Sequence, residues 1–424
     1  MKLIKLKSAL ILALIIITSC KKEEPVPGGN ATSCEVISSD IITTTTLTNR
    51  VSDPNIADYC ITEFISVREG AGLIIEPGVV IEFSNGAGIE VGTYGTSQAN
   101  SGYIIADGIS ADKITFTGAS KTPGSWRGIA ISSTNSDSRN ELDNCIIEYA
   151  GGQELKSGLL GFGLKTAVGV GFSSALQSGL ISITNCIIRN NDGKGYSCRK
   201  GSGLNKFFNN KFENNTEEAV FMSVNGFGKL DPLSSFTGNG FDGFSQSTEF
   251  AVLEQIADTI HTWRGYQGKY SLSVGLRLVY NTAELHIQQG TELVVASGSL
   301  IHVREGLFTA IGVGATGQQR VVFKAETTGV GTWEGIYLES TQDNKVINAD
   351  VNGGGSKIHT GTSAANITIG YRFGKIGKGT VTNCNLRYSG GCGLYVRTTS
   401  PTQRGDLTQS GNLYYGNVGS NICN

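Results

Sequence analysis

The densest group of basic side chains in the sequence falls between residues 189 and 206. Its best-placed members are Arg189, Lys194, Arg199 and Lys200. A Lys or Arg can remove a proton from an acidic sugar, in an elimination that also needs a cation such as Ca²⁺ to neutralise the sugar carboxylate. The four residues are therefore weak catalytic candidates for a polysaccharide lyase.

A structural role competes with catalysis at one of these positions. Glu148 and Arg189 end two similar runs, Asn-Cys-Ile-Ile-Glu and Asn-Cys-Ile-Ile-Arg. If the two runs are stacked strands, the two side chains form an ion pair between neighbouring coils, which at a surface stabilises a protein only slightly. We favour this interpretation over catalysis.

Other catalytic patterns give no firm candidate. All histidines lie in the second half of the chain, and no G-x-S-x-G motif precedes them, so nothing indicates a Ser-His nucleophile. We expect His286 and His302 to face solvent from strands. Glycoside hydrolysis needs two carboxylates at a defined separation. No motif singles out the pairs that could be neighbours, which are Asp143 with Glu148 and Glu217 with Glu218.

Aromatic side chains are the weak candidates for ligand binding, because a flat ring can stack on a sugar. Trp126 and Trp333 lie in two copies of one motif, and Tyr149 is a further candidate. The residue after the Trp is Arg127 in one copy and Glu334 in the other. A residue that serves a shared reaction should not reverse its charge, so we expect the Trp motif to serve the fold.

The N-terminal segment predicts where the protein is located. Residues 1–19 have a basic start and a short apolar core, as in a signal peptide. Ile17-Thr18-Ser19-Cys20 resembles a bacterial lipobox, in which Cys20 receives the lipid. Lys21-Lys22-Glu23-Glu24 resembles the surface-export signal of Bacteroidota lipoproteins, and residues 20–33 form a tether. We expect an outer-membrane protein at the cell surface, held in the membrane by its lipid.

The remaining cysteines fit an exported protein. Eight of the nine are left once Cys20 is lipidated, and disulfides form outside the cytosol. Sequence cannot fix the pairing. Cys34 with Cys60 is the preferred pair, because both lie near the start of the body. We expect the Cys residues at 145, 186 and 384 to be buried. No C-x-x-C motif occurs and no His lies near a Cys, so we predict no metal site and no cofactor, although Asp and Asn at turns could hold Ca²⁺.

The elements that must position these residues are short strands. Apolar runs of three to five residues alternate with turns that contain Gly, Asn, Asp, Pro or Ser, and Gly accounts for 58 of 424 residues. Asn recurs at the turns, where it tolerates left-handed backbone and can stack its amides in ladders. This pattern predicts an all-β protein, a right-handed parallel β-helix.

The body is duplicated. Gly124–Ile129 is repeated at Gly331–Ile336, and matching blocks precede and follow both segments in the same order. We therefore expect two tandem copies of a unit of roughly 200 residues, copy 1 at residues 34–243 and copy 2 at residues 244–424.

Several runs together resemble the right-handed β-helix lipoproteins of Bacteroidota, distant architectural relatives of pectate-lyase-like enzymes. The resemblance is good over residues 40–220 and looser over 265–415. It implies a fold and no defined activity. The runs that carry it are Leu73–Phe83, Gly88–Val91, Ile104–Gly108, Ile114–Gly118, Gly124–Ile131 and Cys145–Gly152.

The expected function follows from the net charge, the predicted fold and anchor, and the lack of a catalytic constellation. The net charge of −2 gives no sign of a nucleic-acid partner. A rigid solenoid with a lipid anchor and no catalytic constellation suits a non-catalytic binding or adhesion module, with a polysaccharide as its expected partner. The alternative is a polysaccharide lyase or glycoside hydrolase of the same fold. Sequence leaves the oligomeric state open.

Overall fold

The structure is a computed structural model that describes residues 34–155, 164–171, 179–198, 203–247, 254–314, 319–370, 376–398 and 404–424. The predicted signal peptide, Cys20, the tether, Arg199 and Lys200 lie outside the described residues. Short strands dominate the described part, with two 3₁₀ helices, η1 (Gln98–Asn100) and η2 (Val224–Lys229). No helix in the described ranges is long and apolar enough to cross a membrane.

Each turn of the chain contributes one strand to each of three faces, which we call a, b and c in chain order. In copy 1, face a is a six-stranded sheet and face b is an eight-stranded sheet. Sheet a1 consists of β2 (Thr45–Leu47), β5 (Ala71–Ile75), β8 (Gly102–Asp107), β11 (Glu141–Asp143), β14 (Ile181–Thr184) and β17 (Leu204–Phe208). Sheet b1 consists of β1 (Glu35–Ile37), β3 (Tyr59–Ile61), β6 (Val80–Phe83), β9 (Ile114–Gly118), β12 (Cys145–Glu148), β15 (Ile187–Arg189), β18 (Lys211–Glu213) and β20 (Ser235–Thr237).

A 13-stranded sheet, the long sheet, passes through both copies. Its strands in copy 1 are β4 (Phe64–Val67), β7 (Gly88–Val91), β10 (Ile129–Ile131), β13 (Thr166–Val170), β16 (Lys194–Cys198), β19 (Glu218–Met222) and β21 (Phe241–Gln246). Its strands in copy 2 are β24 (Lys269–Leu272), β27 (Glu292–Val295), β30 (Val321–Ala325), β33 (Ala349–Asn352), β36 (Asn385–Arg387) and β39 (Leu413–Tyr415).

Two further sheets complete copy 2. Sheet a2 consists of β23 (Ile260–Trp263), β26 (Glu284–Gln288), β29 (Leu307–Ile311), β32 (Asn344–Ile347), β35 (Gly377–Thr382) and β38 (Gly405–Ser410). Sheet c2 consists of β22 (Glu254–Gln255), β25 (Leu276–Leu278), β28 (Leu300–Val303), β31 (Gly335–Leu338), β34 (Ala365–Ile369), β37 (Cys392–Val396) and β40 (Ile422–Cys423).

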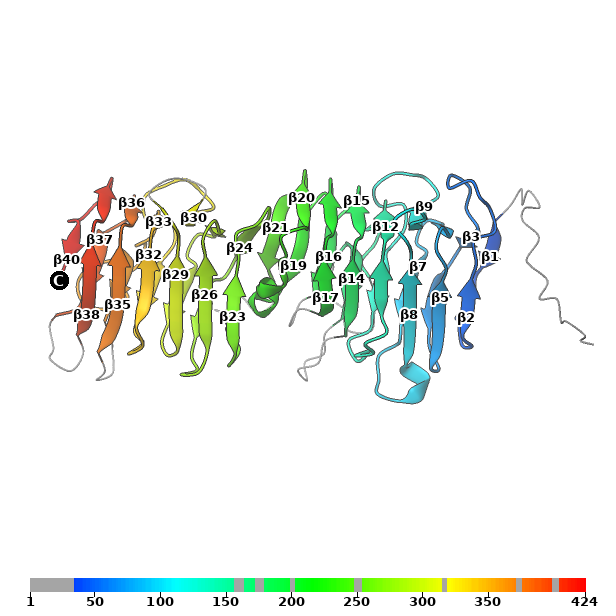
Figure 1. Cartoon of the computed structure of the whole chain (residues 1–424), viewed down its shortest axis with the longest axis horizontal. Coiled ribbons are helices and arrows are strands. Elements are labelled where there is room, and N and C mark those ends of the chain that lie inside the picture. Colours follow the sequence, from blue (N-terminus) through cyan, green and yellow to red (C-terminus); the bar gives the residue numbers. More distant parts are fainter. Residues whose placement is uncertain are drawn as a thin grey trace, which may run out of the picture.

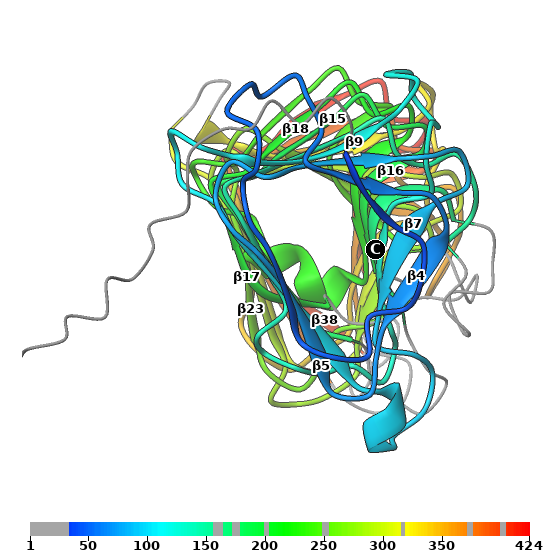
Figure 2. The ribbon, with the colours of Figure 1, turned by 90° about the vertical axis from the view of Figure 1, so that its right-hand side faces the viewer.

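The strands pair in parallel with their equivalents one turn away, which confirms the predicted parallel β-helix (Figure 1). Figure 2 looks from the N-terminal end, and one turn runs clockwise from β15 at the top to β16 on the right, β17 on the left and back to β18. The chain recedes from the viewer as it turns, so the coil is right-handed.

Asparagine marks the corner between faces a and b. Asn144, Asn185 and Asn209 occupy successive turns of copy 1 with φ of 50°, 55° and 52°, and Asn348 and Asn383 take the same place in copy 2 with φ of 48° and 54°. Positive φ is costly for most side chains, and Asn tolerates it. This recurrence explains why Asn is so frequent at the turns.

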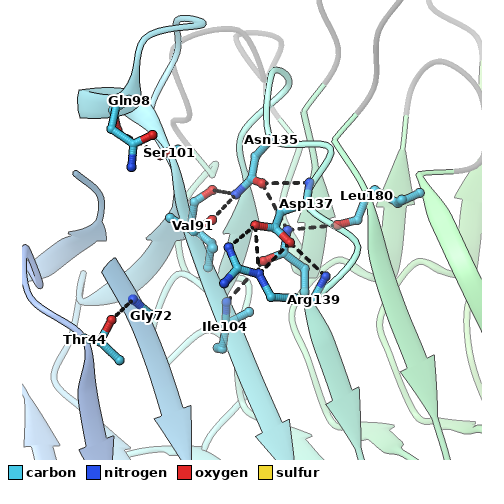
Figure 3. Close-up of polar contacts among 12 residues, drawn as sticks. Thr44, Gly72, Val91, Gln98, Ser101, Ile104, Asn135, Asp137, Arg139 and Leu180 are labelled. Atoms are coloured by element: carbon cyan, nitrogen blue, oxygen red, sulfur yellow. Dashed lines mark hydrogen bonds and ion pairs between the residues drawn. The ribbon is translucent and has the colours of Figure 1, made fainter. Parts of the chain in front are cut away.

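Buried asparagines fasten the corner between faces c and a (Figure 3). Asn135 donates to the Val91 carbonyl at 3.0 Å, and the neighbouring Asn140 accepts from the Ile104 amide at 3.1 Å. Asn344 of copy 2 repeats the role of Asn140, because it accepts from the Phe308 amide at 3.0 Å. Each side chain replaces backbone hydrogen bonds that a sharp corner cannot make.

The two copies form one continuous solenoid. A single hydrophobic cluster extends from Ile41 to Leu394. At the junction it becomes aromatic: the ring of Trp263 lies 5.0 Å from that of Phe227 and 5.5 Å from that of Tyr270. Strand β21 runs across residue 243, where the sequence places the boundary between the copies.

The long sheet changes face at this junction. The repeated blocks make β9 equivalent to β30, yet β9 belongs to sheet b1 and β30 to the long sheet. The long sheet therefore serves as face c in copy 1 and as face b in copy 2. The switch occurs where β21 pairs with β24, while sheets a1 and b1 end and sheets a2 and c2 begin. Face a stays aligned, since β17 and β23 lie on one side of the solenoid in both views.

A disulfide lies near each end of the described body. Cys34 is bonded to Cys60, the pair that the sequence favours, and it links β3 to the residue before β1. Cys392 is bonded to Cys423 and links β37 to β40. The sequence indicates no particular partner for these last two cysteines. The other described cysteines, at 145, 186, 198 and 384, are buried.

Candidate functional site

Arg189, the first of the basic candidates, is neutralised. Its Nε and Nη2 atoms lie 2.9 and 2.8 Å from Oε2 of Glu148, and the two residues are register partners on β12 and β15. The other carboxylate oxygen of Glu148 accepts from the Thr117 hydroxyl at 3.0 Å. The structure thus contains the ion pair between coils that the matching runs indicate. A guanidinium held in this way is a poor base.

Lys194 is also engaged. Its side chain is only 9% exposed, and its Nζ atom contacts the carboxylates of Glu217 and Glu218, the latter at 2.9 Å. The Phe221 ring lies 4.9 Å from the same ammonium. Both described catalytic candidates, Arg189 and Lys194, are therefore paired with acids, and the pair Glu217 and Glu218 serves Lys194.

Both tryptophans are fully buried, so neither offers a platform for a sugar. Nε1 of Trp126 donates to the Glu148 carbonyl and Nε1 of Trp333 donates to the Asn352 carbonyl, each at 2.8 Å. These acceptors hold equivalent positions in the two copies. The Trp motif closes the corner that leads from face b to face c.

Two tyrosines occupy strained positions at this same corner. Tyr149 has φ of 65° and Tyr388 has φ of 55°, whereas Asn190 and Asn214 fill the corresponding corner of other turns. A bulky residue in left-handed backbone costs on the order of 1–2 kcal/mol, and such strain is concentrated at functional sites. Tyr149 is half-buried, and Tyr388 is 41% exposed.

A groove lies beside Tyr388 in copy 2. Its volume is about 550 Å³. Lys324 of β30, Asn352 of β33 and Arg387 of β36 contribute to its wall from three successive turns, and Val330 lies on the loop that borders it. The loop between β30 and β31 and the ends of the three strands together form the wall. No motif in the sequence marks this groove.

The aromatic ring that lines the groove, Tyr388, has a second ring beside it. The rings of Tyr388 and Tyr415 lie 5.7 Å apart in an edge-to-face arrangement, and Tyr415 is 65% exposed. Rings of this kind, one above the other on successive turns, give a sugar chain apolar faces to stack on. The sequence offers Tyr388 only as one of several undetermined aromatic candidates, and it does not single out Tyr415.

A second polar group lies on the outer side of sheet c2. The rings of His302 and His359 stack on the two sides of Tyr337, at 5.1 and 5.3 Å. Nε2 of His302 lies 2.7 Å from Oε2 of Glu339. The side chain of His302 is 13% exposed, so the expectation that it faces solvent is wrong. Burial lowers the pKa of His359, opposed by the nearby Glu334 carboxylate.

This stack holds the 353–364 segment against sheet c2, and its rings cover one another. We therefore regard the stack as a stabilising packing contact rather than a binding site. Within the described ranges, no three His, Cys, Asp or Glu side chains are grouped so that they could hold a metal ion. The groove in copy 2 is therefore the better candidate for a functional site.

Comparisons of the chain with protein-family models, with curated proteins and with solved structures find no match.

Proposed function

We propose that this protein is a lipid-anchored surface module that binds a polysaccharide without cleaving it. The observation that carries the proposal is the groove lined by Tyr388, whose ring contacts the exposed ring of Tyr415. Binding sites for linear polymers are open and elongated, and a solenoid corner that repeats turn after turn provides such a surface.

The strained backbone supports the same site. Asn or Gly would fit the corner at residue 388 without strain, so a tyrosine there sacrifices stability. The stability of the folded protein therefore does not explain why a tyrosine occupies position 388. A ligand that stacks on the ring does explain it. The lyase alternative has less support, because Arg189 and Lys194 are both paired with carboxylates.

The substitution Tyr388→Asn tests the proposal. It removes the ring and places a residue that tolerates φ of 55°, so we expect polymer retention to fall at least tenfold while the melting temperature stays the same or rises. The measurement is retention of the soluble chain on a panel of acidic and neutral polysaccharides, with release of shorter chains scored in the same samples.

Tyr94→Asn is the matched control, since Tyr94 is also exposed, at 54%, but belongs to a loop of copy 1. Equal losses in the two variants would contradict the assignment to the groove. Release of shorter chains by the unmodified protein would establish an enzyme instead, and retention on no polymer would remove the polysaccharide from the proposal.

A further inference from the structure

The two copies differ at three equivalent outward positions that lie side by side on successive turns. In copy 1 these positions hold Thr117, Glu148 and Arg189. The hydroxyl and the guanidinium both bond to the central carboxylate, so this column is closed on itself and electrically neutral.

In copy 2 the same column reads Lys324, Asn352 and Arg387, and Asn352 is the register partner of both basic residues. Copy 2 thus has an amide where copy 1 has the central carboxylate, and it has the ammonium of Lys324 where copy 1 has the hydroxyl of Thr117. The column therefore carries two positive charges where copy 1 carries none in total.

Arg387 has lost the partner that its equivalent keeps. Among the described residues no carboxylate lies in ion-pair contact with its guanidinium. Lys324, by contrast, has its Nζ atom 3.0 Å from Oε1 of Glu292, which also contacts Lys269. The side-chain oxygen of Asn352 is buried and accepts no hydrogen bond in the described part of the chain. All three side chains line the groove of about 550 Å³.

We propose that the groove binds a carboxylate of an acidic polysaccharide, with Arg387 as its principal partner; this rests on the proposed function and names the ligand class for that site. A guanidinium pairs with a carboxylate through two parallel hydrogen bonds. The ring of Tyr388 stacks on the sugar. Copy 1 cannot bind in this way, because Glu148 already fills the position that the ligand carboxylate would take.

The substitution Asn352→Glu tests the inference by rebuilding the copy 1 ion pair in copy 2. Copy 1 shows that the fold accepts Glu at this position. The probe is polygalacturonate, compared with the same polymer after its carboxyl groups have been reduced to alcohols. We expect the unmodified protein to bind the carboxylated polymer at least tenfold more tightly, and Asn352→Glu to abolish that preference.

Thr380→Glu is the matched control, since it adds the same charge on sheet a2, at a residue that does not line the groove, and it should keep the preference. Arg387→Gln should lose the preference, as Asn352→Glu does. A sulfated dextran is the third arm: binding as tight as that of the carboxylated polymer would show a general attraction for anions and would overturn the carboxylate assignment.

Two outcomes separate this inference from the proposed function. If the native and reduced polymers bind equally, the charge recognition fails while polysaccharide binding stands. If neither binds, the proposed function fails, and the inference fails with it. Retention of the carboxylate preference by a folded Asn352→Glu variant would also overturn the inference.

Discussion

Single residues on face c carry buried ionisable groups in both copies. Glu90 on β7 and His302 on β28 occupy equivalent positions, and each is largely covered. Burial raises the pKa of Glu90 to about 7, the nearby Asp40 carboxylate adds to this rise, and a hydrogen bond with Ser66 opposes it. The neighbouring groups differ between the copies: Asp40 and Ser66 lie near Glu90, whereas His302 contacts Glu339.

The raised pKa of Glu90 predicts how stability depends on pH. Between about pH 4.5, the ordinary value, and about pH 7, the folded state holds a proton that the unfolded state has lost. The free energy of unfolding therefore falls as the pH rises through this window, by on the order of 3 kcal/mol, and stays low above it.

Glu90→Gln should remove this dependence and raise the melting temperature at pH 8 relative to the unmodified protein. Thermal unfolding at pH 5 and pH 8 measures the effect. Glu76→Gln, at an exposed position, is the control and should leave the pH dependence intact. An unchanged pH profile in the Glu90→Gln variant would show that Glu90 ionises normally.

At the scale of elements, amide ladders hold successive turns together. Nδ2 of Asn191 donates to Oδ1 of Asn215, and Nδ2 of Asn215 donates to Oδ1 of Asn239, each at 2.7 Å. The same amide of Asn215 donates to the Ile188 carbonyl at 3.1 Å. The ladder thus satisfies buried polar groups that no strand can reach.

Replacing the central member, Asn215→Ala, leaves the buried amide of Asn191 without its acceptor. We expect a loss of about 2–3 kcal/mol, seen as faster hydrogen exchange in β15 and β18. Asn205→Ala, an exposed position on β17, should change exchange little. If the two variants behave alike, the ladder contributes no more than an ordinary surface amide.

Much of this organisation could be predicted from the sequence, and particular residues show where prediction stops. The matching runs that end in Glu148 and Arg189 identify stacked strands because identical neighbours imply identical positions. The groove is harder to predict, because the freedom of Arg387 depends on Asn352, a residue one turn earlier in space and far away in the chain. The stack of His302 on Tyr337 escapes notice for the same reason.

At the scale of the whole molecule, the proposed anchor and the proposed binding site belong to opposite ends. The tether would join the solenoid next to β1, whereas β36, which contributes to the groove, lies near the other end (Figure 1). A rigid rod of this kind would hold the groove away from the membrane that carries the lipid. The change of face by the long sheet, by contrast, could not be predicted, since the repeated blocks indicate only a simple tandem repeat.

Cys20→Ala tests the anchor. Without the lipid we expect the protein to leave the membrane fraction and to lose incorporation of an alkyne-labelled fatty acid. Protease treatment of intact cells then distinguishes surface display from an inward orientation. Full membrane retention of the Cys20→Ala variant would contradict lipidation at this residue.

The change of face at the junction has a mechanical consequence. If the proposed anchor and polymer are both in place, a pull on the polymer would travel along the solenoid axis toward the anchor and would cross the junction on the way. Of the sheets formed by the described residues, the long sheet alone continues across it, through the register pairs of β21 with β24. Tension would concentrate on that ladder and on the aromatic rings beside it, so the rod would yield there first while each copy stayed coiled.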